Sequence, residues 1–388
     1  MTTLWFLLAV AGYFATWLLI PWVLLKKTVG PASAVAWILS VVFLPYFGAM
    51  LLIVFGVNRI ERRKRFKQQA SARIGRRLPS PSGTDDPRER FGDLQRRLSV
   101  LAEKVSSTRP TAGNRVRLLS DGEPTFRLFE EAILAARHSI HVEYYIWQPD
   151  RIGTRLRDLL IRRAREGVEV RFLYDSIGSW WLNAKFLRPM SQAGIAVATF
   201  LPGRSFRERW SINLRNHRKL LIIDGRRGFT GGMNVGDEYL GLDPSFGSWR
   251  DTQVELCGPA VLQLQQVFAE DWYYATNEEL LGAEYYPNPE RGGNVTAQVI
   301  SGGPHADLAT FLSLMFAAIT RAEKRVTLTT SYFVPPSSLA VALETAARQG
   351  VQVRLLVAKK ANYLWTLLAG RSYYKGLLDA GVEIHEYQ

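Results

Sequence analysis

An internal repeat is the feature that most limits what this chain can fold into. Three blocks of sequence recur in the same order: 132–146 matches 318–332, 166–175 matches 349–358, and 192–200 matches 379–387. Three ordered matches favour a duplication over two unrelated units that share sequence patterns common in α/β proteins. The chain has 388 residues, which leaves room for two related lobes and a further segment.

The first copy of the repeat alternates between strand and helix patterns. Residues 140–146 (IHVEYYI) and 168–174 (VEVRFLY) are short runs of β-forming residues, whereas 123–137 and 154–166 have helical patterns. Strands that alternate with helices predict a parallel sheet covered by those helices. We therefore expect an α/β protein built from two duplicated lobes.

The N-terminal segment 1–58 is mainly apolar. Met1–Leu25 and Thr28–Asn58 contain no charged side chain, and each exceeds the ~20 residues that cross the hydrocarbon core of a membrane. A cleaved signal peptide fits poorly, because no basic segment precedes the first run and a second run follows almost at once. We expect residues 1–58 to form a hairpin of two transmembrane helices.

The charge of the chain points to an anionic partner. The net charge is +14, which suits a membrane surface, a nucleic acid or a phosphorylated substrate. Residues 59–67 (RIERRKRFK) hold six basic side chains and one acid directly after the second apolar run. By the positive-inside rule this tract keeps the bulk of the protein in the cytoplasm. It also suits contact with anionic headgroups, although orienting the chain is a sufficient role for it.

Cysteine and histidine usage argues against a metal centre. Cys257 is the single cysteine, so the chain has neither an internal disulfide nor a cysteine-based zinc cluster. Five histidines are scattered without a metal-ligand spacing: His138, His141, His217, His305 and His385. We expect no metal and no cofactor.

One segment gathers polar groups around an apolar strand. It runs from 216 to 234 and reads NHRKLLIIDGRRGFTGGMN. Residues 219–223 are predicted to form a buried strand, and residues two apart on a strand face the same side. His217 and Lys219 should therefore project together where the strand begins. Asp224 ends the strand as a turn signal.

Further polar groups follow a second short strand at 228–230. Gly231 and Gly232 allow a ligand to approach the backbone closely, and Asn234 offers an amide. An imidazole, an ammonium and an amide that converge on one point suit an oxyanion such as a phosphate. The alternative is a structural hairpin that carries a solvated histidine and lysine.

A basic segment precedes this motif. Residues 203–219 interleave two aromatic side chains with six cations: Phe206 and Trp210 with Arg204, Arg207, Arg209, Arg215, Arg218 and Lys219. We interpret the segment as an interfacial loop over the site that holds anionic lipid headgroups. Nucleic-acid binding uses similar residues, but the apolar N-terminus favours lipid. Residues 143–145 (EYY) either line the pocket or pack in the core.

The spacing from His217 to Asn234 resembles the motif of the phospholipase D superfamily. Several segments resemble its bacterial cardiolipin synthase branch, including TAGNRVRLLSDGEPTF, HVEYYIW, WRDTQVELCGPAV and YFVPP. The resemblance covers nearly the whole chain and implies four regions. These are two transmembrane helices at 1–58, a basic juxtamembrane segment and linker at 59–113, a first phospholipase D-like lobe at 114–285 and a second at 286–388.

The resemblance implies a membrane phosphatidyltransferase. Two phosphatidylglycerol molecules would give cardiolipin and glycerol through a phosphohistidine intermediate, in the inner membrane of a bacterium and with the catalytic part in the cytoplasm. No nucleic acid and no cofactor take part in such a reaction. Hydrolysis to phosphatidic acid is the enzymatic alternative, since water need only replace the lipid hydroxyl. The sequence leaves the oligomeric state open.

The resemblance also assigns roles to individual residues. His217 would be the nucleophile, with Lys219 and Asn234 holding the phosphoryl oxygens. Asp224 belongs to the motif, and tying its turn is the favoured role for it. The remaining positions are Gly232, where many members have serine, Asp251 in the segment WRDT, which would orient the nucleophilic imidazole, and Arg215 in the basic segment.

The second lobe is expected to lack its own motif. The repeat places a second His-x-Lys near position 404, beyond Gln388. Three interpretations follow: a fragment of a two-motif synthase, whose 388 residues need not be active by themselves, a protein that pairs two copies of His217 in a dimer, or a non-catalytic membrane protein that binds anionic lipid or a partner. The duplication disfavours the dimer, because the second lobe occupies the place of a partner.

Overall fold

The computed structural model describes residues 10, 12–14, 16–25, 31–52, 74, 86–106, 108–200, 215–242, 249–302, 309–360 and 364–387. The chain divides into two compact units, Met1–Arg63 and Lys64–Gln388. Most of the basic segment 203–219 and the tract 59–67 lie outside the described residues.

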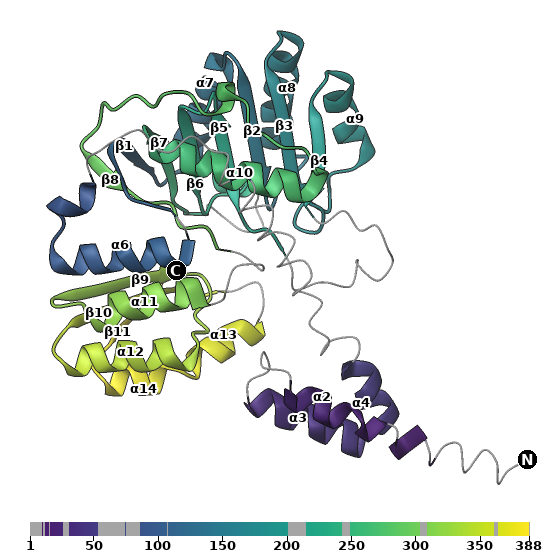
Figure 1. The fold of residues 1–388 in the computed structure, drawn as a ribbon, viewed down its shortest axis with the longest axis vertical. Coiled ribbons are helices and arrows are strands. Elements are labelled where there is room, and N and C mark those ends of the chain that lie inside the picture. Colours follow the sequence, from purple (N-terminus) through teal and green to yellow (C-terminus); the bar gives the residue numbers. More distant parts are fainter. Residues whose placement is uncertain are drawn as a thin grey trace, which may run out of the picture. The chain divides into compact units, whose positions relative to one another are not determined.

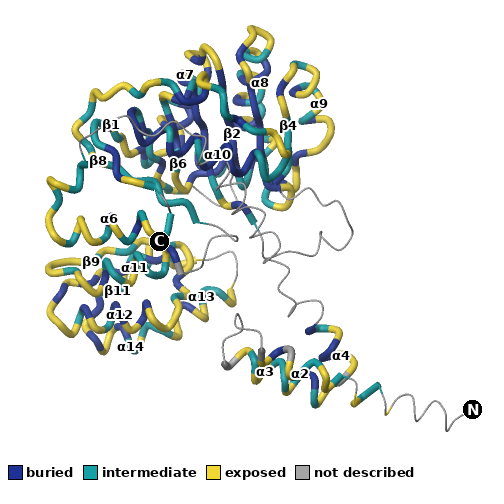
Figure 2. Tube along the Cα trace, viewed as in Figure 1, coloured by how far each residue is buried: buried dark blue, intermediate teal, exposed yellow. Residues whose placement is uncertain are grey.

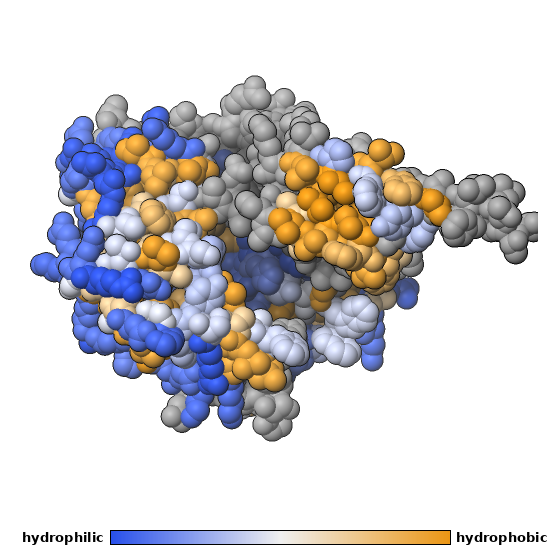
Figure 3. Space-filling view, turned by 90° about the horizontal axis from the view of Figure 1, so that it is seen from below, coloured by the Kyte–Doolittle hydropathy of each residue, from blue (hydrophilic) through white to orange (hydrophobic). Residues whose placement is uncertain are grey.

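The N-terminal unit is a small group of apolar helices. It contains α2 (Leu19–Leu25), α3 (Pro31–Phe43) and α4 (Pro45–Leu51). Val23, Val41 and Leu52 form its core. Many large apolar side chains remain exposed in this unit, among them Phe14, Leu18, Leu24, Val35, Phe43 and Phe47. Figure 3 shows this unit as a mainly hydrophobic surface.

The expected transmembrane hairpin is not supported by these helices. Within the described residues, no helix is both long enough and apolar enough to cross a membrane. The second apolar run is divided, because Leu44 leaves the helical conformation and Pro45 starts a new helix. Proline has no backbone N–H to donate, so it suits the first turn of a helix better than its interior. Parts of both expected spans, including residues 1–9 and 53–58, lie outside the described residues.

The larger unit contains an eight-stranded mixed sheet (Figure 1). Its strands lie in the order β4 (Ala196–Phe200), β3 (Glu169–Asp175), β2 (Ser139–Tyr144), β5 (Lys219–Ile223), β6 (Arg227–Gly231), β7 (Gln253–Cys257), β1 (Thr111–Leu119) and β8 (Val295–Ala297). Strands β2, β3 and β4 are parallel, and every pairing from β2–β5 to β1–β8 is antiparallel. Strand β5 therefore lies where the parallel part of the sheet meets the antiparallel part.

Helices cover both faces of this sheet. Helices α7 (Gly122–Ala135), α8 (Arg151–Arg165) and α9 (Ala184–Gln192) pack on one face, and α10 (Ala260–Thr276) packs on the other. Strand β5 shows the division, since Leu221 and Ile223 join the first core while Leu220 and Ile222 join the second. Burial on both faces explains why Leu220–Ile223 of β5 is a continuous apolar run (Figure 2).

A second, three-stranded parallel sheet follows. Its order is β11 (Glu383–Tyr387), β10 (Gln352–Ala358) and β9 (Arg325–Thr330), with α11 (Ala309–Thr320), α12 (Ser337–Arg348), α13 (Leu364–Arg371) and α14 (Tyr374–Asp379) around it. Helix α6 (Asp93–Ser106) contacts α11. Three 3₁₀ turns complete the described elements: η2 (Pro87–Arg90), η3 (Asp237–Leu240) and η4 (Ala283–Tyr285).

The two sheets have equivalent pairing registers. The parallel pairs of the first sheet correspond to those of the second when the matched blocks of the sequence repeat are aligned. Ser139 pairs with Glu169 as Arg325 pairs with Gln352, and Arg171 pairs with Ala196 as Arg354 pairs with Glu383. A duplicated unit would produce this agreement, because one copied pattern of apolar residues sets the register in both copies.

Asp224 joins the β5–β6 turn to the start of β2. It has a positive φ of 53°, and its carboxylate accepts hydrogen bonds from the backbone N–H groups of Arg137, His138 and Ser139 at 2.8, 2.7 and 2.9 Å. Its own N–H donates to the Ser139 carbonyl oxygen at 2.9 Å. One side chain thus aligns the two strands that carry the site at their other ends.

We expect Asp224→Ala to lower the free energy of unfolding by about 2–3 kcal/mol, because three backbone donors lose a charged acceptor. Urea denaturation monitored by circular dichroism measures this change. Asp121→Ala is the matched control, since the Asp121 side chain makes no capping hydrogen bond at the start of α7. Equal, small effects in both variants would contradict the assignment.

Candidate active site

The motif histidine lies where three strands come together. The pairing of β5 with β2 places Lys219 opposite Tyr144, and the Tyr145 N–H donates to the Arg218 carbonyl oxygen at 3.1 Å. Strand β3 is parallel to β2 and ends beside it at Asp175. In α/β sheets, ligands bind outside the carboxyl ends of parallel strands. The start of β5 is therefore in the position of a binding site.

Two side chains of the motif anchor the strand from its α10 side. The Asn216 amide donates to Glu143 and, at 3.4 Å, to Asp271 of α10. Arg218 pairs with Asp271 at 2.5 Å and donates to the Gly302 carbonyl oxygen at 2.7 Å. Asn216, Glu143 and Asp271 are all buried. Because side chains alternate along a strand, anchoring these two residues directs His217 and Lys219 to the opposite side.

His217 presents its ring to solvent on an aromatic support. Its imidazole stacks on Tyr145, with ring centroids 3.8 Å apart and planes inclined by 23°. Partial burial lowers the pKa of His217, the charges of Lys219 and Arg215 lower it further, and Asp175 opposes them. A lowered pKa keeps the imidazole neutral at neutral pH. A neutral imidazole is the form that can attack an electrophile or accept a proton.

Lys219 is a buried cation beside this ring. Its Nζ donates to the His217 carbonyl oxygen at 2.7 Å and lies 5.5 Å from the centroid of the Tyr145 ring. Burial lowers the pKa of Lys219 to about 8, although the negative charge of Asp251 opposes the shift. A largely desolvated ammonium next to an imidazole favours an anionic ligand.

Asp251 lies against Gly232 and acts on Lys219. A Cβ atom at position 232 would overlap the Asp251 carboxylate, so glycine makes room for that carboxylate. Burial raises the pKa of Asp251, while a hydrogen bond from the Thr252 N–H at 2.6 Å and the charge of Lys219 oppose the rise. The charge that acts on the pKa of Asp251 in this arrangement is that of Lys219, and the expected role of Asp251 in orienting His217 stays a prediction. The carboxylate whose charge acts on His217 is that of Asp175.

Asn234 joins the site through Tyr239. Its Oδ1 accepts from the Ile146 N–H at 3.2 Å and its Nδ2 donates to the Tyr239 hydroxyl at 3.3 Å. Asp251 contributes to the raised pKa of Tyr239, which places these groups near one another. An amide has two N–H donors, so one remains for a ligand after the bond to Tyr239.

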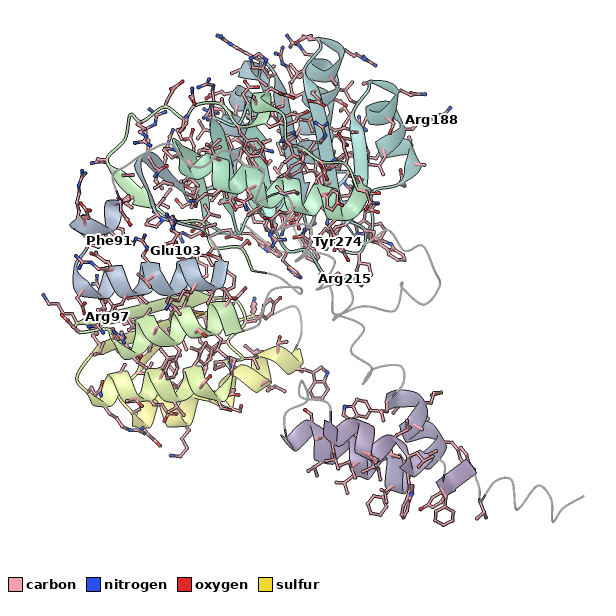
Figure 4. All side chains as sticks on the ribbon, viewed as in Figure 1. Phe91, Arg97, Glu103, Arg188, Arg215 and Tyr274 are labelled. Carbon is pink, nitrogen blue, oxygen red and sulfur yellow. The ribbon has the colours of Figure 1, made fainter. Side chains whose placement is uncertain are left out.

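Asp224 and Arg215 differ in how they relate to His217. Asp224 lies at the far end of β5, roughly 17 Å from Lys219, and is not brought together with His217. Arg215 is partly buried, and its charge reaches His217. Figure 4 shows Arg215 at the lower edge of the eight-stranded sheet as drawn.

Several residues of the site are not singled out by the motif. Tyr145 supports the ring, Asp175 acts on it, and Asn216, Arg218 and Asp271 anchor the strand. Asp175 could have been found from the sequence, because a carboxylate directly after a predicted parallel strand lies at the ligand-binding edge of the sheet. No sequence feature indicated Asp271, since it lies within a helix far along the chain from the motif.

The other described histidines lie elsewhere. His141 is buried against α10, where its ring stacks on Phe268 and its Nδ1 lies 2.9 Å from the Gln265 amide oxygen. Burial lowers the pKa of His141 to about 4, so it remains neutral. His138 precedes β2 at the Asp224 end, and His385 is exposed on β11. Among the described residues, no three acidic, histidine or cysteine side chains are grouped as metal ligands.

The Lys219 ammonium should lose its proton as the pH rises through about 8. Removing the nearby negative charge in Asp251→Asn should move this titration to lower pH, because the protonated form is then less stabilised. Nuclear magnetic resonance of ¹³C-labelled lysine measures both. Asp224→Asn removes a remote carboxylate and should leave the titration unchanged; a shift in that control, or none in Asp251→Asn, would contradict the pairing.

Asp271→Ala should lower the free energy of unfolding by about 3–5 kcal/mol, because Arg218 would keep a largely buried charge without its partner. Guanidinium denaturation measures the loss. Asp158→Ala removes an acid whose ion pair with Arg157 is exposed and should cost less than about 1 kcal/mol. Similar values for the two variants would refute the anchoring role of Asp271.

Comparison with known proteins identifies the family. A family model described as "Cardiolipin synthase, PLD-like domain" matches residues 129–272 and 315–388. Cardiolipin synthase 2 of Bacillus anthracis is 39% identical over 365 residues, which cover 92% of this chain and 70% of that protein. Cardiolipin synthase of Geobacillus thermodenitrificans is 39% identical over 362 residues, which cover 92% of this chain and 72% of that protein.

Comparison with solved structures gives, among others, phosphatidylserine synthase of Haemophilus influenzae, with a TM-score of 0.48 and 15% identity over 73% of this chain and 71% of that one. The resemblance inferred from the motif is confirmed by the family model and the sequence relatives. This chain belongs to the cardiolipin synthase family of phospholipase D-like proteins.

Proposed function

We propose that the site transfers a phosphatidyl group between two phosphatidylglycerol molecules and so makes cardiolipin and glycerol. The observation that carries the proposal is the pairing of a neutral, exposed His217 imidazole with the buried ammonium of Lys219. A nucleophile beside a fixed positive charge suits attack on a phosphodiester. The names of the relatives, which are cardiolipin synthases, agree with this chemistry.

The proposed reaction has two displacement steps at phosphorus. In the first, an imidazole nitrogen of His217 forms the P–N bond, the P–O bond to glycerol breaks, and the glycerol oxygen takes a proton. In the second, a hydroxyl of another phosphatidylglycerol attacks, loses its proton, and releases His217. A general acid–base must move these protons. The superfamily motif assigns this task to a second imidazole.

Lys219 and Asn234 would stabilise the phosphoryl oxygens as negative charge develops. Lys219 supplies a full charge in a place shielded from water, where electrostatic interactions are strong. Asn234 supplies its remaining N–H. We assign Asp251 to holding and tuning Lys219, Asp175 to the electrostatics of His217, and Asp224 to the architecture of the strands.

We further propose that the N-terminal unit inserts into the inner membrane and that the catalytic unit lies on its cytoplasmic side. The exposed apolar side chains of α2, α3 and α4 support insertion, because apolar surface is costly to leave in water. The six basic residues at 59–67 support a cytoplasmic location. The substrate, an anionic lipid, would then lie in the same bilayer.

His217→Asn tests the proposed chemistry in the full chain reconstituted with phosphatidylglycerol vesicles. We expect the unchanged chain to form a phosphatidyl adduct on His217 and, with the second imidazole of the superfamily motif present, to release cardiolipin. The variant should lose both by about a thousandfold or more, because the nucleophile is absent. Mass spectrometry detects the adduct, and chromatography separates the lipid products.

His385→Asn is the matched control, since His385 is exposed on the second sheet. Persistence of adduct or cardiolipin in His217→Asn would remove His217 from the mechanism. Phosphatidic acid in place of cardiolipin would favour the hydrolytic alternative. Binding of phosphatidylglycerol without adduct or product in the unchanged chain would favour a non-catalytic, lipid-binding role.

A further inference from the structure

A short loop beside the site exposes unusually large apolar side chains. The loop follows β3, and Ile177, Trp180 and Trp181 are 40%, 73% and 64% exposed. Single exposed apolar residues are normal, but two adjacent exposed tryptophans and an exposed isoleucine in one short loop are not explained by packing. Tryptophan combines an apolar ring with an N–H donor and is enriched at membrane–water interfaces.

The backbone of this loop is held at both ends. The Asp175 carboxylate accepts from the N–H groups of Ile177 and Gly178 at 2.9 and 3.0 Å. Leu182 is buried, and the Asn183 side chain caps α9 by accepting from the Phe186 N–H at 3.1 Å. These hydrogen bonds hold the backbone of the loop in a conformation that leaves both tryptophans exposed to solvent.

The loop also contacts Tyr145, the residue whose ring supports His217. The Ser179 hydroxyl donates to the Tyr145 carbonyl oxygen at 2.9 Å and accepts from the Trp147 N–H at 3.0 Å. A Cβ atom at Gly178 would overlap the Tyr145 ring, so the loop lies against the ring that supports His217. A surface that receives the tryptophans would thus be brought next to the nucleophile.

The charges around the loop favour its binding to an anionic surface. Residues 176–188 contain no acid and two basic residues, Lys185 and Arg188, both exposed on α9. Figure 4 shows Arg188 projecting outward from this helix. Neither residue forms an ion pair with any residue that the structure describes. Apolar rings flanked by free cations fit the interface of a bilayer that contains anionic lipid.

The second lobe repeats this combination after the equivalent strand. Strand β10 corresponds to β3 by register, and α13, which follows it, exposes Leu364, Trp365 and Leu368, with Trp365 81% exposed. Lys359 and Lys360 precede the helix and are exposed. An exposed tryptophan with adjacent cations after the same strand of each lobe is a second observation in favour of one shared role.

We propose that Ile177, Trp180 and Trp181 dock the catalytic unit onto the surface of an anionic bilayer, so that lipid headgroups reach His217 without leaving the membrane. The inference rests on the proposed function for its substrate. The docking itself is a separate property that does not depend on turnover.

A fluorescent label at Trp181→Cys tests the docking in the full chain with Cys257→Ser. The chain is reconstituted in vesicles of equal parts phosphatidylglycerol and phosphatidylcholine that carry spin-labelled headgroups. We expect strong quenching at position 181 and little at Glu131→Cys, an exposed control position on α7. Equal quenching at the two positions, or none at 181, would overturn the proposal. Quenching or crosslinking that follows protein concentration and not lipid would assign the loop to a second copy and also overturn it.

Turnover provides a second test. Trp180→Ala with Trp181→Ala should reduce activity on vesicles at least about tenfold, because the buried apolar area is lost, and should spare activity on monomeric short-chain phosphatidylglycerol. Phenylalanine at both positions should restore most of it, whereas Leu118→Ala, an exposed apolar control on β1, should have no effect. An equal loss on both substrates would overturn docking. His217→Asn should retain the quenching at 181 while losing turnover, which separates this inference from the proposed chemistry.

Discussion

The geometry of the site depends on a buried polar anchor at the start of β5. Asn216 and Arg218 reach Glu143 and Asp271 on the α10 side, so His217 and Lys219 must face the other way. Burying such groups is costly unless their hydrogen bonds and charges are satisfied, which makes the arrangement specific. A strand that slipped by one residue would bury the imidazole and expose the arginine.

The position of β5 within the sheet gives this anchor its function. Strand β5 enters antiparallel to β2, so the start of β5 lies at the carboxyl ends of β2 and β3. Tyr145 and Asp175, which follow those ends, then surround His217 with an aromatic support and a negative charge. At the opposite end of β5, Asp224 aligns the strands through three backbone hydrogen bonds. The two ends of this short strand thus have different roles: the Asp224 end aligns the strands, and the His217 end carries the chemistry.

Much of this arrangement could be predicted from local pattern. The strand 219–223, the hairpin after it and the helices 123–137 and 154–166 agree with β5, β6, α7 and α8 to within a few residues. The register of the two sheets reproduces the sequence repeat. The electrostatic effect of Asp251 on Lys219 could not be predicted, because it depends on how the segment just before β7 approaches Gly232. The division of the second apolar run at Leu44 and Pro45 was missed, because hydropathy counts apolar residues and ignores the missing N–H.

The sequence by itself determined the family, the repeated α/β pattern and the residue types of the site, because periodicity and motif spacing are properties of the chain alone. Tertiary structure decided which of those residues act together. Lys219 acquires its lowered pKa from burial, and the charge that opposes this shift comes from Asp251, just before β7. Asp224 is separated from the imidazole by the length of a strand, and Asp271 is contributed by α10. Burial and contacts between distant segments exist only after folding, and they set the charge and direction of each side chain.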